Sequence, residues 1–169
     1  MIVDRIRRLI PTALVLAAAG VAQAPKATRP ALAREMVAAH NDVRQRIGLK
    51  PLAWSEPLAR VAQEWANTLI ANGDFAHRTK SPYGENLYEI RGGSSSPAEV
   101  VSSWADESRD YDYASNRCRS MCGHYTQIVW ATTKSVGCAV ARGQGREVWV
   151  CNYDPPGNYV GERPYGALR

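Results

Sequence analysis

Apolar residues recur at helical spacing in the first half of the chain and predict two helices there. The first covers Pro30–Ile47 and ends where Gly48 follows the last apolar position. Ser55 can cap the second helix, which ends at Gly73. His40 lies on the apolar stripe of the first helix, so we expect it to be a structural residue with a fixed hydrogen bond.

A third helix is predicted by the sharpest local signal, the capping box of residues 96–99 with Pro97 at the first helical position. One face of this helix carries Val100, Trp104, Glu107 and Tyr111. Glu107 is therefore expected among buried positions. Because an isolated buried charge costs several kcal/mol, this carboxylate must be paired, hydrogen-bonded, metal-bound or protonated.

The stretch Tyr125–Trp130 is rich in β-branched and aromatic residues and is predicted to form a strand. His124 would start the strand face that becomes apolar. This histidine is either a strand-edge residue satisfied by a backbone carbonyl or part of a polar site. Near the end of the chain, residues 152–159 are rich in turn formers and contain two prolines, which predicts an ordered coil.

Two strand-like runs, residues 136–142 and 146–153, flank a turn at residues 143–145 and predict a hairpin. Directly opposed hairpin residues have position numbers with a constant sum, so Cys138 faces Cys151 at disulfide distance. The other two cysteines are left to close a small loop. We therefore expect two disulfides, Cys118–Cys122 and Cys138–Cys151.

The first 24 residues have the layout of a secretory signal peptide: a basic opening, a short apolar run and small residues at the end. The run is interrupted by Pro11 and is shorter than the roughly 20 apolar residues of a membrane span. Cleavage after Ala22 or after Ala24 fits the pattern. We expect a signal peptide at residues 1–24, a linker at 25–32 and a single domain at 33–169.

The full chain has a formal net charge of +5, and removal of residues 1–24 would lower it to +3. Lysine and arginine are scattered, which excludes a dedicated nucleic-acid surface and leaves weak attraction to anionic membranes or cell walls. A zinc cluster of Cys118, Cys122 and His124 is a rival to the first disulfide. It lacks a fourth ligand with recognisable spacing, and the oxidising conditions of export disfavour it.

Between about Ala33 and Tyr165 the chain resembles the CAP superfamily (SCP domain), which comprises cysteine-rich secretory, antigen five and pathogenesis-related proteins. Among these branches it is most like the plant pathogenesis-related type. The motifs that carry the resemblance occur in the family's order. They are HNDVR at 40–44, YGENL at 83–87, Trp104 with Glu107, GHYTQ at 123–127 with Trp130, and CNYDPPGNY at 151–159.

The resemblance implies an α+β fold, an α-β-α sandwich with a small antiparallel sheet between helical layers and an open cleft. It implies that the cleft is lined by His77, Glu85, Glu107 and His124, matched one motif at a time. Plant relatives usually carry a third disulfide between a cysteine shortly before the His77 region and another soon after Cys138. Neither cysteine is present here.

Two imidazoles and two carboxylates in one cleft are suited to a weakly bound divalent metal such as zinc. The alternative is a hydrogen-bonded His–Glu network that stiffens the cleft without metal. The family resemblance implies a secreted, extracellular monomer, periplasmic in a Gram-negative cell. It would bind a small lipid, a sterol or a cell-surface component, with a defence or antimicrobial role, and would be neither an integral membrane protein nor a nucleic-acid binder.

A metal-dependent hydrolase or peptidase is the rival function, with Glu85 or Glu107 as general base to a metal-bound water. The chain has neither the HExxH motif nor the Gly-x-Ser-x-Gly motif, and its cysteines are assigned to disulfides, so we favour binding over catalysis. A third hypothesis is a peptide precursor, because residues 155–165 resemble the segment released by some plant relatives.

Overall fold

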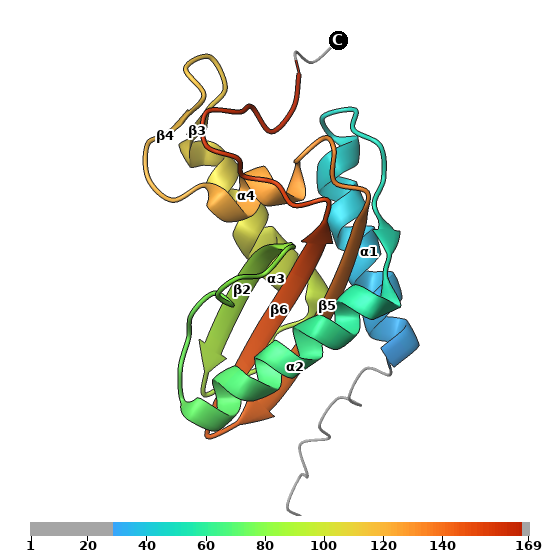
Figure 1. The fold of residues 1–169 in the computed structure, drawn as a ribbon, viewed down its shortest axis with the longest axis vertical. Coiled ribbons are helices and arrows are strands. Elements are labelled where there is room, and N and C mark those ends of the chain that lie inside the picture. The colour runs from blue at the N-terminus through green and yellow to red at the C-terminus, as the bar shows by residue number, and fades with distance from the viewer. Residues whose placement is uncertain (1–28, 167–169) are drawn as a thin grey trace, which may run out of the picture.

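The computed structural model describes residues 29–166, which form a four-stranded sheet with helices on both faces (Figure 1). The helices are α1 (Arg29–Gln45), α2 (Glu56–Asn72), α3 (Pro97–Ala105) and α4 (Gly123–Ile128), with a 3-10 helix η1 (Asp106–Asp110). The sheet strands are β1 (Ala53–Trp54), β2 (Gly84–Arg91), β5 (Ser135–Gly143) and β6 (Arg146–Asp154). A separate two-stranded sheet pairs β3 (Tyr111–Asp112) with β4 (Arg117–Cys118).

The expected α-β-α sandwich is confirmed. In Figure 1, α2 crosses one face of β5 and β6, and α1 and α3 lie behind the sheet. A small-residue core fills the α2 side, and a larger core around Met36, Trp104 and Trp149 fills the other. None of the described helices is long and apolar enough to cross a membrane. The predicted signal peptide lies outside the described residues, whereas α1 already begins at Arg29, within the expected linker.

The sheet is mixed rather than purely antiparallel, with strand order β1-β5-β6-β2. The three long strands β2, β6 and β5 pair antiparallel as expected, and the two-residue β1 adds a parallel pairing with β5 that the sequence did not predict. Ala53 donates its N–H to the Lys134 carbonyl at 3.0 Å, and Ser55 donates to Val136 at 2.9 Å. A strand of two residues is too short to show a period-two pattern in the sequence.

Helix α2 packs directly on the sheet. Ser55 caps its first turn through Leu58 N–H, and Gly73 ends it in a left-handed conformation (φ 76°), as predicted. Gly137 of β5 lies under the helix, where a Cβ atom would come within 2.3 Å of the Ala59 nitrogen. Glycine is therefore required at this contact.

The segment predicted as a strand from Tyr125 is instead the short helix α4, so that prediction was wrong. Thr126 N–H donates to the Cys122 carbonyl at 3.0 Å, and Val129 N–H donates to Tyr125 at 3.1 Å. Every residue from Tyr125 to Trp130 is buried. A short run that is apolar on all sides shows neither helical nor strand periodicity, and here long-range packing decides its structure.

Arg44 is a fully buried charge on α1 that the apolar stripe did not predict. Its guanidinium donates to the carbonyls of Ile128 at 2.8 Å and Trp130 at 2.9 Å, at the C-terminal end of α4. It also donates to Lys50 at 2.8 Å. Burial lowers the pKa of Arg44 to about 10, so the side chain stays protonated at neutral pH and ties α1 to α4.

Strands β5 and β6 pair in the predicted register, with Cys138 opposite Cys151 and their Cα atoms 4.1 Å apart. Both expected disulfides, Cys118–Cys122 and Cys138–Cys151, are present. The buried Arg146 at the start of β6 donates to the Leu69 and Gly73 carbonyls at 3.0 Å and to that of Asp74. It thus joins the hairpin to the end of α2.

Candidate functional site

His77 and Glu85 form the first of two His–Glu pairs. His77 lies in the loop after α2 with its side chain 64% exposed, whereas the Glu85 side chain, near the start of β2, is 6% exposed. His77 Nδ1 lies 2.7 Å from Glu85 Oε1, which also accepts the Arg78 N–H at 3.0 Å. The other carboxylate oxygen, Oε2, is buried and has no hydrogen-bond partner among the described residues.

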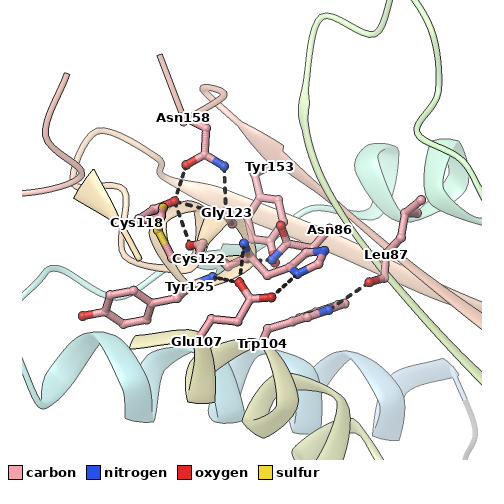
Figure 2. A network of polar contacts seen from close by, with 12 residues as sticks. Asn86, Leu87, Trp104, Glu107, Cys118, Cys122, Gly123, Tyr125, Tyr153 and Asn158 are labelled. Atoms are coloured by element: carbon pink, nitrogen blue, oxygen red, sulfur yellow. Dashed lines mark hydrogen bonds and ion pairs between the residues drawn. A yellow bond between two sulfur atoms is a disulfide. The ribbon is translucent and has the colours of Figure 1, made fainter. Parts of the chain in front are cut away.

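Glu107 and His124 form the second pair. Figure 2 shows Glu107 between Tyr125 and Trp104. Glu107 Oε1 lies 2.7 Å from His124 Nδ1, and Oε2 accepts the N–H groups of His124 at 2.9 Å and Tyr125 at 3.3 Å. One carboxylate therefore satisfies both the imidazole and the first turn of α4. Trp104 stacks on the His124 ring, with ring centroids 6.0 Å apart and an interplanar angle of 25°.

The predicted third helix ends before Glu107, which lies in η1 rather than on a continuous helical face. Tyr111, the last residue counted on that face, belongs to β3. Glu107 is only partly buried, with its side chain 15% exposed. The prediction that it needs partners agrees with the structure, because both oxygens accept hydrogen bonds. The helical count past Ala105 was wrong because the backbone tightens to 3-10 geometry there.

The N-terminal turn of α4 is fixed by the C-terminal coil. Asn158 donates its amide to the Gly123 carbonyl at 2.8 Å (Figure 2). Its side-chain oxygen accepts the Thr126 hydroxyl at 2.7 Å. The Cys118–Cys122 disulfide closes the loop that leads into the helix. These contacts explain how a six-residue helix holds its position.

A buried hydrogen-bond chain connects α1 to His124, and the sequence did not reveal it. The His40 ring donates Nδ1–H to the Met36 carbonyl at 2.7 Å, so Nε2 accepts the Tyr153 hydroxyl at 2.8 Å. Asn86 donates its amide to the Tyr153 oxygen and to the His124 carbonyl, both at 3.1 Å. His40 is thus the structural residue that its position on the apolar stripe predicted.

The two His–Glu pairs are arranged around strand β2, which is an edge strand of the sheet. Asn86 points toward α4, as its bond to His124 shows, and Leu87 belongs to the core under α2. Since side chains alternate along a strand, Glu85 lies with Leu87 on the α2 side. The two pairs therefore lie on opposite faces of β2.

Hydrogen bonding fits His77 and His124 for metal binding through one ring nitrogen each. In both, Nδ1 donates to a carboxylate, which leaves Nε2 with its lone pair and without a hydrogen-bond partner among residues 29–166. Glu107 has both oxygens occupied, so it orients an imidazole, whereas Glu85 keeps one free buried oxygen. The donor set fits an open metal site with two imidazole ligands.

The same residues do not form a closed four-ligand site. Among residues 29–166, one set of three His, Cys, Asp or Glu side chains offers possible ligand atoms within 4.8 Å of one another. That set is His40, Cys138 and Cys151, whose two sulfurs are joined in a disulfide and are not thiolates. Cys118, Cys122 and His124 do not form such a group, and the structure joins the two cysteines in a disulfide.

Three pKa values in and behind the site are shifted. The hydrogen bond to Glu85 raises the pKa of His77 above its ordinary value. Burial lowers the pKa of His40 to about 4 and raises the pKa of Tyr153 well above its ordinary range. The buried chain therefore stays neutral at physiological pH, and the exposed His77 gains a proton more readily than a free imidazole.

Comparison with known proteins matches residues 37–153 to the family described as CAP, the cysteine-rich secretory protein family. The chain is 43% identical over 133 residues to pathogenesis-related protein 1 of Arabidopsis thaliana, covering 78% of this chain and 81% of that protein. It is 46% identical over 130 residues to pathogenesis-related protein 1A of Nicotiana tabacum, covering 75% and 77%.

Solved structures share the fold. Venom allergen-like protein 4 of Schistosoma mansoni matches with a TM-score of 0.65 and 27% identity, over 80% of this chain and 94% of that one. The structure described as NaASP2 with Zn²⁺ matches with a TM-score of 0.68 and 21% identity, over 82% of this chain and 86% of that one.

Proposed function

Because this chain belongs to the CAP family of cysteine-rich secretory proteins, we propose that it is an exported binding protein with a defence-related role. Its ligand would be a small lipid, a sterol or a component of a cell surface. The predicted signal peptide and the relatives named as pathogenesis-related proteins support this proposal.

The cleft around β2 would bind a divalent metal weakly through His77 Nε2 and His124 Nε2. The observation that carries this part is the same in both pairs: a carboxylate accepts the Nδ1 proton at 2.7 Å and leaves Nε2 available. Zinc suits neutral imidazole ligands, and the relative NaASP2 was solved with Zn²⁺. When bound, the metal would add a positive charge at the edge of β2.

The hydrogen bonding and burial of the two glutamates favour a binding function over hydrolysis. Glu107 already accepts three N–H groups, which stabilise its ionised form and leave one of about four lone-pair sites, so it is a weak general base. Glu85 Oε2 is free but buried, and a general base must reach the proton that it removes. Both glutamates are therefore suited to orienting imidazoles.

The test is an inventory of the molecules that co-purify with the exported protein. Organic extraction followed by mass spectrometry should recover a lipid or sterol near one equivalent per protein. Reloading the stripped protein with that lipid should restore the complex. Empty protein that hydrolyses peptides or esters, with loss of turnover in Glu85→Gln, would contradict the proposal and favour the hydrolase.

A further inference from the structure

A second candidate site lies at the opposite end of the sheet from the His–Glu pairs. A cavity of about 320 Å³ opens between the loop of residues 92–94 and the two arms of the β5–β6 hairpin. Gly92 N–H donates to the Gly145 carbonyl at 2.9 Å and holds the loop against the hairpin. Glu85 and Arg91 are six residues apart on β2, so about 20 Å separates this cavity from the first pair.

Arg142 is held at the wall of this cavity by a buried carboxylate. Its Nε donates to Glu147 Oε2 at 2.6 Å, and the Glu147 side chain is 2% exposed. The other oxygen of Glu147 accepts the Ser95 N–H at 3.1 Å and the Trp149 indole N–H at 2.5 Å. Within residues 29–166, Nη1 and Nη2 of Arg142 donate no hydrogen bond, so a fixed guanidinium presents a free edge.

The ionisable residues that line the cavity carry a formal charge of +1, from Arg142, Arg146 and Glu147. Arg146 is buried and directs its Nη groups to carbonyls at the end of α2. Glu147 accepts hydrogen bonds from three N–H groups, which stabilise its negative charge. Because Glu89 Oε1 lies 3.1 Å from Arg146 Nε, the charge of Arg146 is already paired, and the preference for an anion rests on the Nη edge of Arg142. A guanidinium edge matches the two oxygens of a carboxylate or phosphate.

The glycines around the cavity have another explanation. Gly92 and Gly145 have φ values of 70° and 71°, which residues with a side chain rarely adopt. A Cβ on Gly143 would lie 2.7 Å from the Ile70 side chain. Backbone shape and packing require glycine at these positions. The anion preference comes from Arg142, and the Ser94 hydroxyl at the rim is a free donor among the described residues.

We propose that this cavity binds the oxyanion group, carboxylate or phosphate, of a sugar-sized molecule through the free edge of Arg142. The volume exceeds that of an inorganic ion and lies at the lower end of small-molecule sites. The site is separate from the proposed metal cleft, so it would give the protein a second ligand of a different class.

The test is an amide NMR titration of the protein with D-glucuronate, D-glucose 6-phosphate and neutral D-glucose, at constant low ionic strength. Either anion should give saturable shifts at Gly93, Ser94 and Gly145, and D-glucose should not. The anion that binds with the higher affinity identifies the preferred oxyanion group as a carboxylate or a phosphate. No saturable shift with either anion, or equal shifts with chloride, would overturn the proposal.

Three variants make the test specific. Arg142→Gln should weaken anion binding about tenfold or more, because it removes a charged hydrogen-bond donor. Gly93→Leu should block the cavity without touching Arg142, since a Cβ there meets only Ile90, at 3.4 Å. Arg91→Gln is the matched control, because Arg91 is exposed beside the cavity and pairs with Glu89. Binding that survives both Arg142→Gln and Gly93→Leu would contradict the assignment.

Discussion

Glu107 organises the site at the scale of single residues. Its two oxygens accept three N–H groups, from the His124 ring, His124 N and Tyr125 N. Because a carboxylate can only accept here, the ring proton is fixed on Nδ1 and the lone pair on Nε2. One side chain thus sets both the start of α4 and the tautomer of a proposed ligand.

Replacing Glu107 with Gln should lower the free energy of unfolding by about 1–2 kcal/mol, because charged hydrogen bonds become neutral ones. The amide can donate to His124 Nδ1, which would move the ring proton to Nε2 and weaken metal binding. Urea unfolding and the ¹⁵N shifts of the His124 ring measure the two effects. Asp106→Asn is the control, since Asp106 is 65% exposed and pairs only with Arg109. Equal effects of the two variants would contradict the assignment.

His40 should make the protein sensitive to acid. Its folded-state pKa is about 4, below the ordinary value of 6.5 in the unfolded chain. Between these values the unfolded chain binds a proton that the folded chain does not. The contribution of His40 to the free energy of unfolding is therefore fully present above pH 6.5, and about 3 kcal/mol is lost as the pH drops toward 4.

The measurement for His40 is urea unfolding at several pH values between 7 and 4. In His40→Gln the loss of stability over this interval should be smaller than in the wild type by about 3 kcal/mol, even if the variant is less stable throughout. If the free energy of unfolding falls equally with pH in the two proteins, His40 does not change its protonation on unfolding.

Sequence reasoning succeeded at single residues where a local pattern carries the information. His40 was identified as a polar group on an apolar helical face, and Glu107 was identified by a helical count that continues past the observed end of α3. The partners could not be predicted, because Tyr153 lies 113 positions from His40 and Asn86 lies 38 positions from His124. Arg44 was missed because its carbonyl partners are brought together only by α4.

At the scale of elements, Arg146 joins the hairpin to the end of α2. Arg146 donates to the carbonyls of Leu69, Gly73 and Asp74 and lies 3.1 Å from Glu89 Oε1. One buried side chain thus connects β6 to the end of α2 and to β2.

Arg146→Met should lower the free energy of unfolding by about 3 kcal/mol, because it leaves buried carbonyls without their donor and removes one of the two cations beside Glu89. Amide hydrogen exchange at residues 69–74 should accelerate more than exchange in α1. Arg91→Met is the matched control, since its side chain is 68% exposed and its ion pair with Glu89 is worth little. An unchanged stability in Arg146→Met would mean that the contact does not hold the hairpin.

Long elements with clear signals were predictable, and short ones were not. The caps of α2 and α3 and the hairpin register follow from local sequence. The six-residue α4 and the two-residue β1 exist because tertiary contacts supply what local propensity does not. The residues of the site could be predicted from the sequence. Its geometry depends on α4 and could be seen only in the structure.

At the scale of the whole molecule, edge strand β2 lies between the two His–Glu pairs. The α2 layer carries His77 near Glu85, and the α3–α4 layer carries Glu107 and His124. The sandwich was predictable from the family motifs. The division of the site between the two faces of β2 follows from strand register and was not visible in the motifs.

Calorimetric zinc titration at pH 7.5 and pH 5.5 tests the central claim, that His77 and His124 hold a metal through Nε2. The wild type should bind weakly at pH 7.5 and less at pH 5.5, because protons compete with the metal for the imidazole nitrogens, and the hydrogen bond to Glu85 raises the pKa of His77. His77→Ala and His124→Ala should each weaken binding, and His40→Gln should not. Equal zinc binding by the wild type and the His77→Ala, His124→Ala double variant would contradict the account.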